Sequence, residues 1–110
     1  MGSAQSAVRS AAVFAALGDE TRLRLVARLC REGPLSIARL TDGFAITRQA
    51  ITKHLRVMKK AGVVRVSWKG RESVWSVEQK RLARAERDLE AIATQWDETL
   101  GRLKDFVEEE

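Results

Sequence analysis

Residue types that build special sites are scarce in this sequence of 110 residues. It contains one cysteine, one histidine and one proline, and aromatic residues make up only 5% of the chain. A single cysteine excludes a disulfide within the chain, which fits a reducing cytoplasm. Because aromatic residues are so few, aliphatic side chains must fill most of the core.

Long apolar runs are also missing. No run approaches the roughly 20 residues of a membrane-spanning helix, and no apolar segment near the start is typical of a signal peptide. The sequence has no glycine-rich phosphate loop, no paired carboxylates in an apolar setting and no Ser or Cys spaced to pair with a His. We therefore expect a single cytoplasmic domain that is not an enzyme, holds no cofactor and does not contact a membrane.

Charge, in contrast, is abundant and unevenly distributed. Residues 1–77 contain 14 Lys or Arg against 5 Asp or Glu, whereas residues 78–110 contain 6 against 10. The chain thus has a basic body followed by an acidic segment. A basic body favours a polyanionic partner such as nucleic acid, although composition alone fits a solvated basic surface equally well.

The most basic part of the chain is the segment from Thr47 to Val77, with eight Lys or Arg and one acid. Thr47 is expected to cap a helix that ends near Gly62. Its apolar positions follow helical spacing and consist of Ile51, Leu55 and Met58. Two alternating strands then flank Lys69-Gly70, which predicts a hairpin with Trp75 inside and Trp68 partly exposed near the tip.

Three further helices are predicted before this segment. The first covers residues 7–17, the second follows a capping Asp19, and a short third helix follows a capping Ser36. The buried side of the second helix should hold Leu23, Leu25, Val26 and Leu29, and Cys30 is expected to pack as a small residue rather than act as a redox switch.

A long helix without proline is predicted over residues 78–109. Two sets of residues recur every seven positions along it, which favours a wide seam for packing against another helix: Leu82, Leu89, Trp96 and Leu103, and beside them Ala85, Ile92, Thr99 and Phe106. The fold class is therefore mainly α, an α+β winged helix with the order helix-helix-helix-helix-β-hairpin-long helix. Residues 1–110 form one winged helix-turn-helix domain, with the helix-turn-helix at 36–61 and the wing at 63–77.

Two stretches resemble a known family. Leu17-Gly18-Asp19-Glu20-Thr21-Arg22-Leu23-Arg24-Leu25 is similar to a signature of the ArsR/SmtB family of bacterial repressors. The stretch from Ile51 to Val64, with Lys53-His54-Leu55-Arg56, resembles the recognition helix of that family, and Lys69-Gly70-Arg71 lies where its wing turns. The resemblance covers about residues 8–107. It implies a homodimeric winged-helix repressor in which the first and last helices, 7–17 and 78–109, form the dimer interface.

The metal-binding features of that family are absent. Members that sense arsenic or cadmium carry a cysteine pair at the start of the third helix, and the segment from Leu35 to Leu40 has none. Members that sense zinc, nickel or cobalt use Asp, His and Glu of the last helix, which here has acids but no His or Cys. Since a stable zinc site needs several converging ligands, one Cys and one His predict no metal site. His54 is interpreted as structural or close to DNA.

The predicted DNA contacts divide into two sets. Residues opposite the apolar stripe of the fourth helix would meet base edges in the major groove, and both their position and the resemblance place four residues there: Arg48, Gln49, Thr52 and Lys53. A second set would meet the DNA backbone or form the wing contacts, with capping, salt bridges or a solvated basic turn as the alternatives: Thr21, Arg22, Arg56, Lys59, Lys69 and Arg71.

The predicted homodimer interface consists of Val8, Phe14, Leu82, Leu89, Ile92, Trp96 and Leu103. The function expected is a repressor, associated with the nucleoid, that binds an inverted-repeat operator in double-stranded DNA. Two other functions remain open from the sequence: a non-specific architectural DNA-binding protein and a coiled-coil protein-interaction module. The signal that releases DNA also remains open among a small-molecule inducer, oxidation of Cys30, a protein partner or simple autorepression.

Overall fold

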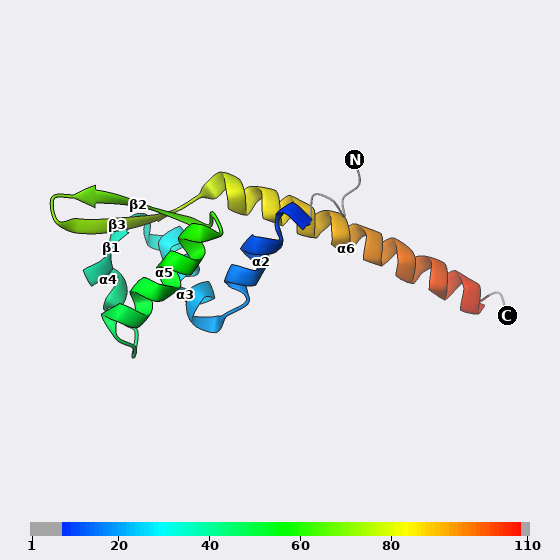
Figure 1. Cartoon of the computed structure of the whole chain (residues 1–110). Helices are drawn as coiled ribbons and strands as arrows, with labels where there is room; N and C mark the ends of the chain where they lie inside the picture. Colours follow the sequence, from blue (N-terminus) through cyan, green and yellow to red (C-terminus); the bar gives the residue numbers. More distant parts are fainter. Residues whose placement is uncertain (1–7, 109–110) are drawn as a thin grey trace.

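The computed structural model describes residues 8–108, and in it a small helical body carries one projecting helix (Figure 1). The molecule measures 67 × 31 × 20 Å along its principal axes. Its elements follow in the order α2 (Ala11–Leu17), α3 (Glu20–Glu32), β1 (Leu35–Ser36), α4 (Ile37–Thr41), α5 (Arg48–Lys60), β2 (Val64–Lys69), β3 (Glu72–Val77) and α6 (Gln79–Glu108). Ala7 and Glu109, the predicted ends of the first and last helices, lie outside the described residues. The predicted winged-helix fold class is confirmed.

Three predicted capping residues begin helices in the structure. The side chain of Asp19 accepts a hydrogen bond from the Arg22 amide at 2.9 Å. Ser36 and Thr47 act in the same way at the starts of α4 and α5. Each cap satisfies one of the amide groups that the first turn of a helix leaves without a partner, so these helix starts are encoded locally.

The core lies where α3, α4 and α5 meet the sheet. The apolar stripe of α5, predicted from its spacing, is entirely buried, and it packs with buried residues of the neighbouring helices and strands. Trp75 is 6% exposed and closes the core from the sheet side, whereas Trp68 is 68% exposed. Both tryptophans are placed as predicted.

The sheet has three antiparallel strands in the order β1-β3-β2. The hairpin of β2 and β3 was predicted, but β1 was not. It pairs Leu35 with Trp75 and Ser36 with Val74. Two residues are too short for a periodic pattern, and their partner strand lies about forty positions away in sequence, so only the folded chain defines this strand.

Two predictions for α3 are wrong. Leu23 was expected on the buried side but is 52% exposed, and Cys30 was expected to pack inside but is exposed. Because successive residues turn by about 100° around a helix, Leu23 lies about 200° from the buried Leu25. Cys30 lies about 100° from the buried Leu29, which takes it beyond the edge of the buried stripe.

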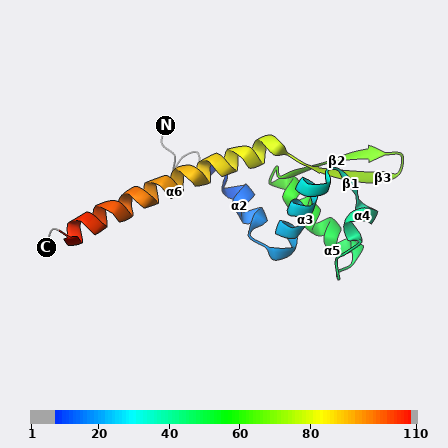
Figure 2. The same cartoon turned by 180° about the vertical axis from the view of Figure 1, so that it is seen from behind.

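The first half of α6 belongs to the body and the second half leaves it. Ala85 and Asp88 are buried against α2, and the Ser10 hydroxyl donates to an Asp88 carboxylate oxygen at 2.5 Å. Beyond this contact the helix extends away from the other elements, as the opposite views in Figures 1 and 2 agree. The apolar residues of this distal half are exposed, and Trp96 keeps 60% of its surface accessible. Within residues 8–108, no helix combines the length and apolar character that a membrane crossing requires.

Candidate nucleic-acid interface

Helix α5 separates an apolar face from a polar one. Opposite the buried stripe, Arg48, Gln49, Lys53 and Arg56 are exposed, and Thr52 is half-buried. All four predicted base-contacting residues, together with Arg56, line one shallow hollow on the surface of this helix. The Thr52 hydroxyl donates to the Arg48 carbonyl at 2.9 Å, which leaves its oxygen lone pairs and its methyl group available.

The turn before α5 is held in place by an arginine of α3. Arg28 Nη1 donates to the carbonyl oxygens of Leu40, at 3.2 Å, and Asp42, at 2.6 Å. Its Nε donates to Glu32 at 2.8 Å. These contacts tie the end of α4 and the turn to α3, so the start of α5 has a defined position. Sequence reasoning missed Arg28, because no local pattern identifies two carbonyl partners beyond position 39.

The basic residues predicted for backbone contact lie at several places. Lys59 is exposed in the last turn of α5, where a cation also suits the helix dipole. Lys69 and Arg71 are exposed on either side of Gly70, whose φ of 60° allows the tight turn of the hairpin. In Figure 1 this turn is at the free end of β2 and β3. The structure thus brings the residues predicted to contact bases together on one helix, and it places the predicted wing cations on the separate β2–β3 hairpin.

Thr21 and Arg22 lie in the first turn of α3, and both are half-buried. The Arg22 guanidinium is engaged within the protein: Nε donates to the Ala16 carbonyl at 2.6 Å, and Nη1 lies 3.3 Å from His54 Nδ1. This geometry favours the structural alternative for Arg22. The His54 ring also lies 3.9 Å from the Asp19 carboxylate, so its contacts within the protein favour the structural interpretation of this residue.

The environment of Asp19 keeps its carboxylate ionised. The hydrogen bond from the Arg22 amide is the main cause that lowers the pKa of Asp19 below its ordinary value of 3.8. Partial burial acts in the opposite direction, while the charges of Arg22 and His54 and the Thr21 amide lower the pKa further. Asp19 therefore serves both as the cap of α3 and as a negative charge beside Arg22 and His54.

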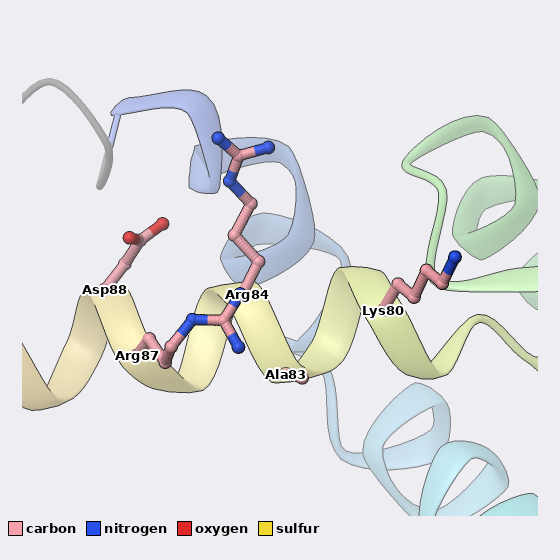
Figure 3. A pocket seen from close by; sticks show the side chains of 5 residues that line it. All are labelled: Lys80, Ala83, Arg84, Arg87 and Asp88. Carbon is pink, nitrogen blue, oxygen red and sulfur yellow. The ribbon is translucent and has the colours of Figure 1, made fainter.

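A second hollow lies on α6, away from α5. Lys80, Ala83, Arg84, Arg87 and Asp88 line it (Figure 3). Figure 3 shows Arg84 and Arg87 leaving the helix in different directions, so their charges do not converge on one point. Among the described residues, no group of three His, Cys, Asp or Glu side chains is arranged to hold a metal ion. The exposed face of α5 and the wing therefore remain the principal candidate site.

Comparisons with known proteins agree with this geometry. Residues 17–67 match a family model described as a helix-turn-helix domain. The HTH-type transcriptional regulator Rv2034 of Mycobacterium tuberculosis is 34% identical over 79 residues, covering 72% of this chain and 73% of that protein. The arsenical resistance operon repressor of Bacillus subtilis is 28% identical over 69 residues, covering 63% of this chain and 66% of that protein.

Solved structures show the same fold. The ArsR-like transcriptional regulator from Rhodococcus sp. RHA1 superposes with a TM-score of 0.75 at 35% identity, and the match covers 90% of this chain and 92% of that one. The similarity thus includes the wing and much of α6 as well as the helix-turn-helix. The chain belongs to the ArsR/SmtB family of winged helix-turn-helix proteins, and it is a DNA-binding transcriptional regulator, not an enzyme.

Proposed function

We propose that this protein is a homodimeric repressor that binds an inverted-repeat operator in double-stranded DNA. The observation that carries the proposal is the division of α5 into two faces, one completely buried and the other carrying the exposed Arg48, Gln49 and Lys53 and the half-buried Thr52. The name of the B. subtilis relative, an operon repressor, supports repression as the outcome. The protein would act in the cytoplasm, in association with the nucleoid.

The side chains on the exposed face suit the major groove. Arginine pairs with guanine O6 and N7, glutamine pairs with adenine N6 and N7, and the threonine methyl contacts the methyl of thymine. Three of these residues, Arg48, Gln49 and Thr52, lie in the first turns of α5, the part of a recognition helix that reaches base edges. We assign these three and Lys53 to base contacts.

The remaining exposed cations would bind the DNA backbone on both sides of the bases. Arg56 and Lys59 continue along α5, while Lys69 and Arg71 extend from the wing. Thr21, at the start of α3, adds a neutral donor. Contacts of this kind hold the protein in register without reading sequence. The wing would therefore contribute affinity at the flanks, and α5 would contribute discrimination.

The exposed seam of α6 supports a dimer. Large apolar residues at successive helical turns remain accessible in the single chain, among them Leu89, Ile92, Trp96 and Leu103. A continuous exposed patch of this kind marks a protein–protein contact. Phe14 of α2 and Leu82 of α6 are partly buried against the core of their own chain. Val8, three residues before α2, is exposed. A two-fold dimer through α2 and α6 would place two copies of α5 about one helical turn apart on DNA, roughly 34–36 Å.

Binding to DNA tests the proposal directly. The wild-type protein should select a palindromic site from a pool of random duplexes, and the affinity should fall steeply with salt as counterions are released. Arg48→Ala or Gln49→Ala should lose about 1–3 kcal/mol of discrimination between the selected and a scrambled site. Lys69→Ala is the matched control, since it should weaken both sites equally.

Three outcomes would contradict the proposal in different ways. Equal affinity for selected and scrambled DNA would indicate a non-specific architectural protein. A monomer at every concentration, with DNA binding absent, would indicate a protein-interaction module. An operator that is bound as a dimer but activates a reporter gene would leave the DNA contacts standing and remove repression.

A further inference from the structure

Arg22 occupies a junction of three helices. It belongs to the first turn of α3, its Nε reaches the last turn of α2, and its Nη1 reaches His54 in the middle of α5. Its own backbone amide is held by Asp19. The Arg22 side chain therefore connects α2 and α3 with α5, the helix that carries the proposed DNA-facing surface.

The contact with α2 fulfils a specific need of that helix. The last carbonyl groups of a helix have no partner within it, and Ala16 lies in the last turn of α2 with its side chain buried. The Arg22 Nε–H donates to the Ala16 carbonyl oxygen at 2.6 Å, so a cation closes the C-terminal end of α2, where the helix dipole favours it.

Arg22 also contacts α5, through the side chain of His54. His54 lies beside Lys53 and three residues after Ile51, so its ring emerges between the buried stripe and the DNA-facing side and is half-buried. Because a guanidinium only donates hydrogen bonds, the 3.3 Å contact between Arg22 Nη1 and His54 Nδ1 is a hydrogen bond in the tautomer that leaves Nδ1 unprotonated. The ionised Asp19, 3.9 Å from the same nitrogen, balances the charge of the arginine.

We infer that Arg22 is a positioning residue that sets the orientation of α5 relative to α2, and that it does not bind a DNA phosphate. The planar guanidinium suits this role because its donors leave in fixed, divergent directions. The two Arg22 nitrogens with contacts in the structure, Nε and Nη1, both lie against acceptor atoms of the protein. Since Ser10, immediately before α2, is bonded to Asp88 of α6, Arg22 also links the recognition helix to the helices proposed for dimerisation.

This inference rests on the proposed operator binding. The salt dependence of DNA affinity distinguishes a positioning role of Arg22 from a contact between Arg22 and a DNA phosphate. The probe is a duplex selected by the wild-type protein, compared with a scrambled duplex of equal length. Arg22→Ala should lower operator affinity at least tenfold and leave scrambled-DNA affinity within about twofold. The slope of log affinity against log salt should stay unchanged, whereas a lost phosphate contact would reduce it by about 0.9.

Conservative and double variants sharpen the test. Arg22→Lys keeps the charge, so it would restore binding to a phosphate, but one ammonium group cannot reproduce the divergent donors, and we expect it to behave like Arg22→Ala. The double variant Arg22→Ala/His54→Ala should lose no more operator affinity than Arg22→Ala alone, since both changes break one connection. Arg24→Ala is the matched control, since Arg24 is an exposed arginine of α3 whose guanidinium forms an exposed salt bridge with Glu20, and this variant should bind like the wild type.

The results that overturn the inference are distinct. Unchanged operator affinity in Arg22→Ala, a reduced salt slope, or rescue by lysine would each refute it while leaving operator binding intact. If Arg22→Ala does not fold, the NMR signal of the wild-type Arg22 Nε–H decides instead. A signal protected from solvent exchange and unmoved by DNA is expected, and an exchanging signal that shifts when DNA is added would refute it. A wild type without preference for any duplex would overturn the proposed function itself.

Discussion

Helices α5 and α6 present the same kind of apolar pattern but end in different surroundings. In both, aliphatic or aromatic residues recur three and four positions apart. The stripe of α5 is wholly inaccessible, whereas most of the stripe of α6 beyond Ala85 is exposed. An amphipathic pattern thus predicts that a face will be covered, but it does not say whether the cover comes from the same chain. In α5 the cover is the core, and for α6 we propose a second copy.

The largest effect should come from opening the buried side of α5. Leu55→Ala removes a fully buried side chain and should lower the free energy of unfolding by about 2–5 kcal/mol, the usual cost of lost burial and the remaining cavity. Denaturant unfolding measures the change. Val57→Ala, on the exposed side of the same helix, should cost less than about 0.5 kcal/mol. Similar losses in the two variants would mean that the burial contrast within α5 does not hold in solution.

The exposed side of α6 should respond through association. Leu89→Asp places a charge in the proposed seam and should weaken the dimer by roughly 2–4 kcal/mol, or about thirtyfold or more in Kd. Sedimentation equilibrium would show the shift to monomer, and operator affinity should fall with it. Glu90→Ala, one position away from the seam, is the control. A wild-type protein that is monomeric at all concentrations would contradict the proposal that a second copy covers the exposed side of α6.

The smallest effect concerns acid stability and belongs to the body rather than to α6. The pKa of Asp19 is lowered in the folded protein, so its ionised form contributes stability above the unfolded value of 3.8, and this contribution is lost as pH falls through the lower folded value. Asp19→Asn keeps a good helix cap and removes only the charge. Its stability deficit relative to the wild type should therefore be present at neutral pH and vanish in acid. Thermal unfolding at a series of pH values tests this, and a deficit independent of pH would contradict the assigned cause.

Local signals were enough for much of the fold. The caps at Asp19, Ser36 and Thr47 and the stripe of α5 were predicted because a helix start and a helical face depend on residues only a few positions apart. The hairpin could be predicted in the same way, because a glycine between two alternating strands indicates a tight turn, and Gly70 has the positive φ that this turn requires. The DNA-facing residues of α5 followed from its buried stripe, because the two faces of a helix are geometrically linked. Their role as base contacts remains a prediction.

Features that depend on residues far apart in the sequence could not be predicted from these local patterns. β1 exists only because Leu35 meets Trp75, and Ser10 meets Asp88 across 78 positions of the chain. Leu23 was misplaced because a helix rich in leucine offers more apolar positions than its buried stripe can use. Arg22 carries a charge that fits a phosphate or a carbonyl equally well, and only its neighbours in the fold distinguish the two.

The linear sequence predicted the order of helices and the hairpin of a winged helix-turn-helix, and it placed basic residues opposite the buried stripe of α5. Helix caps, glycine turns and apolar periodicity all act within a few residues, so they can be read from the linear order. The folded chain was needed to show that Arg22 and Arg28 bond to protein carbonyl groups, that Leu23 and Cys30 face solvent, and how much of the apolar face of α6 stays uncovered. These properties depend on what lies across the structure from each side chain, and contacts between residues distant in sequence set them.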